Sequence, residues 1–166
     1  MSKDISCDFP TSGKIYLNNA SVSLMPLESI DAMKDFLLEY NSIGPDSIES
    51  EPLIIEKLRS IRKTISKIIN CQPDEVILTQ STTDGINIVA NGLSFLKNSN
   101  IIIRGLSHEH HANFYPWLRL QNKITVNSLS IDTHGFFDLA ELEKLLDENT
   151  RIVALSHALY NTGAIM

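Results

Sequence analysis

Hydrophobic and polar residues alternate with the period of a helix in the first part of the chain. The clearest example is a stripe of isoleucine and leucine side chains that recurs every three or four residues, with charged residues between them. The stripe consists of Ile54, Leu58, Ile61, Ile65, Ile68 and Ile69. An earlier helix is predicted to begin at Pro26 and to reach Tyr40, because Pro favours a helix start and apolar residues follow at helical spacing. Residues 41–50 are predicted to form the loop between the two helices.

The pattern changes after Cys71, where short apolar runs alternate with helical patterns. Strands are predicted at 75–78, 100–103, 124–129 and 151–155, and helices at 84–96, 112–121 and 139–146. The run Ile101–Ile103 is typical of a strand buried on both faces of a parallel sheet. Strands that alternate with helices predict an α/β fold with a mostly parallel, doubly wound sheet. We expect an N-terminal arm at 1–14, a helical extension at 15–70 and the α/β part at 71–166.

Composition narrows the class of protein. The chain has 166 residues, 43% of them hydrophobic and 20% charged, which is ordinary for a globular domain. A formal net charge of −6 argues against a nucleic-acid partner, and there is no apolar run long enough to span a membrane. The N-terminus lacks the apolar core of a secretion signal. The two cysteines, Cys7 and Cys71, form no disulfide framework, so we expect a cytoplasmic, reducing location.

Polar residues with candidate chemistry follow three of the predicted strands. They lie in TQSTTDGIN at 79–87, SHEHH at 107–111 and SHALYNTG at 156–163. Ligands of open α/β sheets bind outside the carboxyl ends of the strands. All three clusters are therefore expected at the same edge of the sheet.

The first cluster places Ser81, Thr82 and Thr83 at the start of a helix. Free backbone N–H groups and the helix dipole make such a site suitable for an anion, and the hydroxyls add donors for a phosphate. The alternative is ordinary N-capping, for which Ser and Thr are preferred. There is no GxGxxG motif and no Walker lysine, so nucleotide binding is not indicated.

The second and third clusters are ambiguous on their own. An imidazole after a strand, such as that of His110, can stack on a planar cofactor, relay protons or bind a metal. HExxH is absent because Ala112 replaces the second histidine, so a metal-dependent hydrolase is a minor alternative. In the third cluster, Tyr160 and Asn161 offer hydrogen-bonding groups and Gly163 permits close backbone approach, although an ordinary turn would also explain them.

The chain resembles the N-terminal half of class V aminotransferase-type proteins, which use pyridoxal 5'-phosphate, and the cysteine desulfurase branch in particular. The matching stretches are IYLNNAS at 15–21, TQSTTDGINIVA at 79–90, SHEHHANFYPW at 107–117, GFFDLAELEKLLDENTRIVALSH at 135–157 and NTG at 161–163. They keep the family's order and spacing along nearly the whole chain from Ile15. The resemblance implies part of a fold-type-I large domain, with 71–166 as the first portion of the cofactor-binding domain.

The resemblance also assigns roles to single residues. Thr82 and Thr83 match the positions that hold the cofactor phosphate, where Ser81 is a further candidate. His110 matches the histidine that stacks on the pyridine ring and transfers protons, and it is the expected catalytic residue. Tyr160 and Asn161 are expected to contact the cofactor. The turn that contains Asn19 and Ala20 matches a segment near the substrate entrance.

Two departures from the family pattern affect the expected activity. Tyr160 stands where the desulfurases have an asparagine, and Asn161 follows one place later. The lysine that attaches to the cofactor, the aspartate that pairs with the pyridine nitrogen and the persulfide cysteine all lie further along the family's sequence. Neither Lys123 nor Lys144 is on an element that could replace that lysine.

Three functional hypotheses follow. The first is the N-terminal portion of an enzyme that acts on an amino acid, as a cysteine desulfurase or a related lyase or aminotransferase. A complementary C-terminal half or a homo-oligomer partner would then be required, and this chain alone would be inactive. The second is a non-catalytic interaction protein of the same family. The third is the metal-dependent hydrolase.

Overall fold

The computed structural model describes residues 8–9, 11 and 13–166. Most of the predicted arm at 1–14, including Cys7, lies outside the described residues. The chain divides into two compact units, residues 1–78 and residues 79–166, and each is described by itself.

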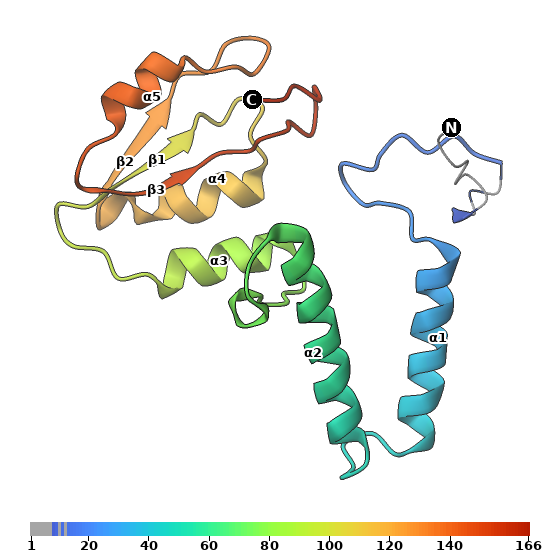
Figure 1. The fold of residues 1–166 in the computed structure, drawn as a ribbon. Coiled ribbons are helices and arrows are strands. Elements are labelled where there is room, and N and C mark those ends of the chain that lie inside the picture. The colour runs from blue at the N-terminus through green and yellow to red at the C-terminus, as the bar shows by residue number, and fades with distance from the viewer. Residues whose placement is uncertain (1–7, 10, 12) are drawn as a thin grey trace. The chain divides into compact units, whose positions relative to one another are not determined.

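Two helices form the N-terminal unit, as the sequence pattern predicts (Figure 1). Helix α1 spans Leu27–Ser42 with Pro26 as its N-cap, and helix α2 spans Ser50–Ile69. The loop between them is closed by a reciprocal pair of hydrogen bonds. The Ser47 N–H donates to Ser50 Oγ at 2.9 Å, and the Ser50 N–H donates to Ser47 Oγ at 3.1 Å. Helix α2 ends where Asn70 adopts a left-handed conformation with φ of 55°.

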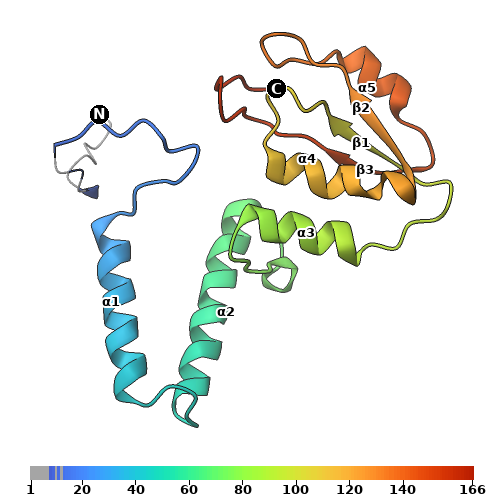
Figure 2. The ribbon, with the colours of Figure 1, turned by 180° about the vertical axis from the view of Figure 1, so that it is seen from behind.

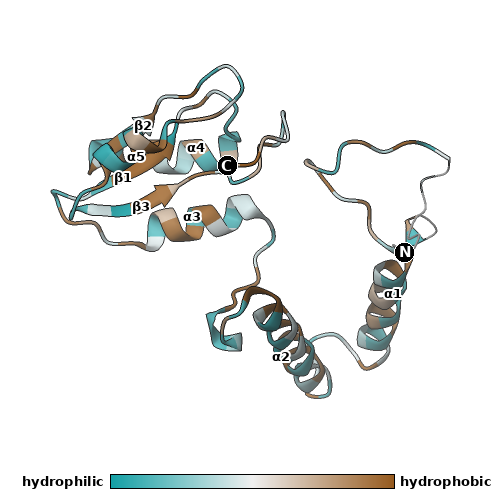
Figure 3. Ribbon diagram, turned by 45° about the horizontal axis from the view of Figure 1, so that its top comes forward, coloured by the Kyte–Doolittle hydropathy of each residue, from teal (hydrophilic) through white to brown (hydrophobic). Residues whose placement is uncertain are grey.

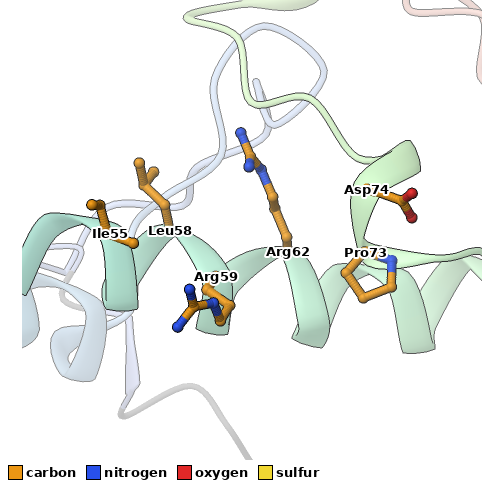
Figure 4. A pocket seen from close by; sticks show the side chains of 6 residues that line it. All are labelled: Ile55, Leu58, Arg59, Arg62, Pro73 and Asp74. Carbon is orange, nitrogen blue, oxygen red and sulfur yellow. The ribbon is translucent and has the colours of Figure 1, made fainter. Parts of the chain in front are cut away.

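The apolar stripe of α2 is only partly covered in this unit. Ile68 is 78% exposed and Ile61 is 43% exposed, although the spacing predicts core packing for both. Part of the helix lines a shallow pocket of about 310 Å³ with the 3₁₀ helix η2, Pro73–Glu75 (Figure 4). The lining residues are Ile55, Leu58, Arg59, Arg62, Pro73 and Asp74. The apolar face of α2 therefore remains available for contact with other surfaces.

A three-stranded parallel sheet forms the centre of the C-terminal unit, which confirms the predicted α/β class (Figures 1 and 2). The strands β1, Asn100–Arg104, β2, Thr125–Leu129, and β3, Thr150–Ala154, lie in the order β2-β1-β3. In the register, Ile102 pairs with Asn127 on one side and with Val153 on the other. The helices are α3, Thr82–Gly92, α4, His111–Leu118, and α5, Leu139–Leu145, with a 3₁₀ helix η3, Arg119–Asn122, after α4.

Alternation along β1 divides the core into two faces. Ile101 and Ile103 pack with Phe114 and Trp117 of α4 and with Ala90 of α3. Because side chains of a strand alternate, Ile102 and Arg104 point to the opposite face. All five residues of β1 are buried, as expected for a central parallel strand. Hydrophobic residues colour much of the strands and of α3 brown in Figure 3.

The predicted strand at 75–78 is wrong. Residues 73–75 form the 3₁₀ helix η2, and the chain then runs to Gln80 without strand hydrogen bonding. Val76 is buried, but Ile77 is 72% exposed and Leu78 is 39% exposed, so the short apolar run that suggested a strand does not alternate between a buried and an exposed face. A strand also needs a hydrogen-bonded neighbour, and the described residues provide none beside this segment.

Helix boundaries also differ from the prediction. Helix α3 begins at Thr82 and not at 84, because Ser81 caps it, and it ends at Gly92 and not at 96. Helix α4 changes to the tighter 3₁₀ form after Leu118. Within the described part of the chain, no helix is both long and apolar enough to cross a membrane.

Acid should weaken the C-terminal unit through Asp147. Its Oδ1 accepts hydrogen bonds from Asn100 Nδ2 at 2.7 Å and from the Asn149 N–H at 2.9 Å. These hydrogen bonds hold the pKa of Asp147 below its ordinary value, and the bond from Asn100 has the largest effect. A folded-state pKa below the unfolded one stabilises the fold above the unfolded value, and this contribution is lost as the pH falls through the lowered pKa. We expect Asp147→Asn to destabilise the chain at neutral pH and to change stability less in acid.

Urea unfolding at pH 7 and pH 3 measures this difference. Glu148→Gln, an exposed neighbour of the same charge, is the matched control and should have little effect at either pH. An equal loss of stability at both pH values for Asp147→Asn would contradict the assignment.

Candidate functional site

The starts of two helices and the ends of two strands meet at one edge of the C-terminal unit. Helices α3 and α4 run opposite to the strands, so their N-termini lie at the carboxyl ends of β1 and β3 (Figures 1 and 2). A groove of about 360 Å³ passes between these elements. It is lined by Gly85 in the first turn of α3, Asn113 in the first turn of α4, and Leu155 directly after β3. All three predicted polar clusters begin or end at this edge.

At the start of α3, one residue caps the helix and the next two have backbone N–H groups that can bind a ligand. Ser81 is the N-cap, and its Oγ accepts a hydrogen bond from the Asp84 N–H at 3.1 Å. For Ser81 the structure thus shows the capping alternative. Thr82 and Thr83 follow as the first two helical residues and are exposed. Backbone N–H groups at these positions have no partner inside a helix, so they and the threonine hydroxyls can receive an anion.

His110 lies directly before α4, and its ring caps the helix. It is the N-cap residue, and its Nδ1 accepts a hydrogen bond from the Ala112 N–H at 3.2 Å. The imidazole also meets the ring of Tyr160 edge to face, with centroids 5.4 Å apart. Because Nδ1 acts as an acceptor, Nε2 is the nitrogen that carries the exchangeable proton of the neutral ring. The side chain is exposed, so Nε2 is accessible to a ligand.

His108 makes a second connection between the same two loops. Its Nδ1 lies 3.0 Å from the side-chain Nδ2 of Asn161. The backbone of His108 has φ of 64°, which is uncommon for a residue with a side chain. The histidine cluster and the Tyr160–Asn161 segment, far apart in sequence, are therefore in contact through two pairs of side chains.

Glu109 is the residue that the sequence analysis did not single out. Its side chain is 2% exposed. One carboxylate oxygen, Oε1, accepts from the His110 N–H at 2.7 Å and from Ser156 Oγ at 2.6 Å, and Oε2 accepts from the Ser156 N–H at 3.2 Å. Glu109 thus joins the loop after β1 to the residue Ser156 beyond β3. The only signals in the sequence are an acidic residue beside His110 and a serine shortly after a strand.

Asn19 and Ala20 belong to the N-terminal unit and to a turn that the sequence predicted. The Ser21 N–H donates to the Asn18 carbonyl at 3.1 Å, and the Tyr16 hydroxyl donates to the Val22 carbonyl at 2.7 Å. This fixes the turn locally. Their expected role near the substrate stays a prediction.

The histidines do not gather with other metal-binding side chains. Among the described residues, no three His, Cys, Asp or Glu side chains lie close enough to hold a metal ion together. His108 and His110 instead contact Asn161 and Tyr160. No observation on this part of the chain thus favours the metal-dependent hydrolase.

Comparisons with known proteins agree in pointing to one family. The family model for aminotransferase class V matches residues 15–166. A probable cysteine desulfurase of Methanothermobacter thermautotrophicus is 33% identical over 99% of this chain and 41% of its own length. A cysteine desulfurase of Escherichia coli K12 is 31% identical over 92% of this chain and 41% of its own length. The chain therefore spans about 41% of the length of these curated relatives.

Solved structures give the same result for the fold. The apo cysteine desulfurase of Thermococcus onnurineus matches 98% of this chain and 41% of its own chain, with a TM-score of 0.80 and 26% identity. A mutant of C-DES with glycine covalently linked to its pyridoxal phosphate matches 93% of this chain and 41% of its own, with a TM-score of 0.81 and 25% identity. The predicted partial fold-type-I architecture is thus confirmed.

Two replacements of His110 should show how much the capping of α4 by its side chain contributes to stability. His110→Ala removes the cap of α4, and loss of a cap typically costs about 1 kcal/mol of stability. His110→Asn keeps a side chain that can cap the helix, so we expect it to be more stable than His110→Ala. Urea unfolding of both variants measures the difference, with the exposed His134→Ala as control. Equal stability of the alanine and asparagine variants would show that the His110 side chain does not cap α4.

Proposed function

The chain belongs to the class V aminotransferase family, and on this premise we propose that it is the N-terminal portion of a pyridoxal-phosphate-dependent enzyme that acts on an amino acid. The observation that carries the proposal is that α3 and α4 pack together and both begin at the carboxyl edge of the sheet, α3 with Thr82 and Thr83 and α4 with His110 as its N-cap. A phosphate and a planar ring are the two parts of the cofactor that these groups would hold.

The start of α3 would bind the phosphate of pyridoxal 5'-phosphate. The N–H groups of Thr82 and Thr83 are free for an anion, and the positive end of the helix dipole favours its charge. The hydroxyls of the same two residues can add hydrogen bonds. Ser81 is fixed as the cap and would act by ordering this turn.

His110 would face the cofactor ring. Its Nδ1 is occupied by the Ala112 N–H, so the ring orientation is set before any ligand binds. The accessible Nε2 is then the atom at which His110 can hold or release a proton. When bound, the cofactor supplies an electron sink for bonds at the substrate Cα.

The third cluster would form the side of the site next to His110. Tyr160 supports the His110 ring by its edge, and Asn161 is engaged with His108. A tyrosine hydroxyl differs from the asparagine amide of the desulfurases in length and in donor geometry. We therefore propose only that the substrate is an amino acid. Cysteine desulfurase, lyase and aminotransferase activity are the alternatives. Asn19 and Ala20 are proposed to contact the substrate.

The lysine that attaches to the cofactor is proposed to come from a polypeptide region that this sequence does not contain. The relatives are longer, and the chain covers about 41% of their length. A complementary C-terminal half or a homo-oligomer partner could supply the lysine. We propose that these 166 residues act only together with that lysine-bearing region. The cytoplasmic location drawn from cysteine usage also stays a prediction.

A second candidate function is a non-catalytic interaction protein of the same family. The observation that favours it is the apolar groove beside β3, where Val153 is 41% exposed and only one side of the strand is paired within the described residues. An open edge and apolar side chains favour association. The same surface would receive the complementary half of a complete enzyme, so the two functions differ in cofactor binding and not in association.

Binding of the cofactor phosphate can be tested on the chain itself. We expect pyridoxal 5'-phosphate to shift the backbone amide NMR signals of Thr82 and Thr83, because the phosphate accepts their N–H groups. Pyridoxal, which lacks the phosphate, should shift them much less. Thr83→Val should weaken binding about 10-fold by removal of one hydroxyl that bonds a charged group, whereas Thr83→Ser should not. Equal shifts with pyridoxal and its phosphate would exclude this site.

Activity can be tested by adding the missing part. We expect activity toward L-cysteine or another amino acid only when the chain is mixed with a polypeptide that carries the remaining, lysine-containing part of the fold. Val153→Lys should block assembly because it places a charge in the groove beside β3, and Val153→Ile, which stays apolar, should assemble normally. Assembly without any cofactor binding would favour the interaction protein over the enzyme.

A further inference from the structure

Two loops of the C-terminal unit supply the His110 side of the candidate site. His110 ends the loop after β1, and Tyr160 lies in a hairpin that follows β3, at the red end of the chain in Figure 1. The hairpin is closed by its own backbone, because the Leu159 N–H donates to the Ala164 carbonyl and the Gly163 N–H donates to the Leu159 carbonyl, each at 2.9 Å. A closed hairpin keeps its own shape, so its position relative to His110 depends on contacts between the two loops.

The connection of Glu109 with Ser156 joins these loops in a buried place. Glu109 is 2% exposed, and its carboxylate accepts all three of its hydrogen bonds. Oε1 receives the His110 N–H at 2.7 Å and the Ser156 hydroxyl at 2.6 Å, while Oε2 receives the Ser156 N–H at 3.2 Å. The ring contacts between the same loops lie at the surface. The buried bridge is therefore the connection that water disturbs least.

Three donors that point at two oxygens suit a carboxylate and not an amide. A glutamine of the same shape has one oxygen and one NH₂ group. If the glutamine oxygen takes the place of Oε1, its NH₂ group faces the Ser156 N–H. If the oxygen takes the place of Oε2, the NH₂ group faces the His110 N–H. In both orientations two donors oppose each other in a buried place, which is unfavourable.

We propose that Glu109 is a positioning residue, which through Ser156 holds the Tyr160 hairpin at a fixed distance from His110. The two rings, whose centroids are 5.4 Å apart, then form one continuous wall of the site. The start of α3 belongs to another element and takes no part in this bridge. Loss of the bridge should thus open the side of the site that would face the cofactor ring and leave the phosphate side intact. That consequence rests on the proposed function, whereas the bridge itself belongs to the chain alone.

The test uses the full chain without cofactor and changes each end of the bridge. Glu109→Gln opposes two donors, Ser156→Ala removes the hydroxyl bond, and Ser156→Thr keeps a hydroxyl. The readouts are the nuclear Overhauser contact between the His110 and Tyr160 rings, the exchange of the His110 and Ser156 amide protons with water, and the urea midpoint. Glu143→Gln makes the same chemical change at an exposed residue of α5 and is the matched control.

We expect Glu109→Gln to weaken the ring contact and to speed exchange of at least one of the two amides about 10-fold, because a buried hydrogen bond to a charged group is lost. Ser156→Ala should act in the same direction to a smaller extent, and Ser156→Thr should restore the ring contact. The double variant E109Q/S156A should be little less stable than E109Q, since a single bridge links the two residues. The control should leave all three readouts unchanged.

The effect on the ligand side is measured with two probes, pyridoxine 5'-phosphate and inorganic phosphate. Pyridoxine 5'-phosphate has the ring but no aldehyde, so it does not react with exposed lysines. The wild-type chain should bind it more tightly than inorganic phosphate, because ring contacts add to those of the phosphate. E109Q should lose most of this difference and keep its affinity for inorganic phosphate. An equal loss of affinity for both probes would indicate general damage and would contradict a role on the ring side.

An unchanged ring contact in Glu109→Gln, or additive losses of stability in the double variant, would overturn the proposal. If Glu109→Gln does not fold, Ser156→Ala decides: a weakened ring contact supports the bridge, and an intact one overturns it. If the wild-type chain binds neither probe, the proposed function fails. The ring contact and the exchange rates then still decide the role of Glu109, because they are measured without any ligand.

Discussion

The hydrogen bonds of one buried carboxylate connect the parts of the candidate site. Glu109 follows the central strand and binds both the His110 backbone and Ser156, in the loop after β3. Without this connection, the loop after β1 and the loop after β3 would be joined chiefly by exposed contacts, those of His108 with Asn161 and of His110 with Tyr160. A carboxylate that accepts several hydrogen bonds in a buried place is far more directional than either surface pair. Glu109 thus fixes the His110 backbone, while the bond from the Ala112 N–H sets the direction of the His110 ring.

Much of the C-terminal unit could be predicted from the sequence because its signals are local. Ile101–Ile103 form a buried strand because three successive apolar β-branched residues leave no face for water. Alternation of strands and helices then gives a parallel sheet, and the carboxyl ends of parallel strands bring the polar clusters to one edge. The meeting of residues 79–87, 107–111 and 156–163 follows from topology. It needs no knowledge of side-chain contacts.

The rest depends on partners that are distant in sequence. The segment 75–78 has the apolar, β-branched run of a strand, but no neighbouring strand lies beside it in the described chain, so the local pattern could not decide its structure. Nothing in the sequence distinguishes Glu109 and Arg104 from other charged residues. Both are buried, and Glu109 bonds to Ser156, which lies far along the chain. Roles of Asn19 and Ala20 could be suggested only by family resemblance, since their turn has no chemistry of its own.

The backbone conformation of His108 restricts which residues can occupy this position of the loop. A φ of 64° suits glycine best, and a side chain in that conformation carries a penalty of roughly 1 kcal/mol. Glycine would relax the backbone but would lose the contact of the ring with Asn161. Asparagine tolerates the same φ, yet its shorter side chain would reach less far toward the opposite loop. The histidine adopts this unfavourable φ, and its ring still reaches Asn161. Few other side chains both tolerate the positive φ and span the distance to the opposite loop.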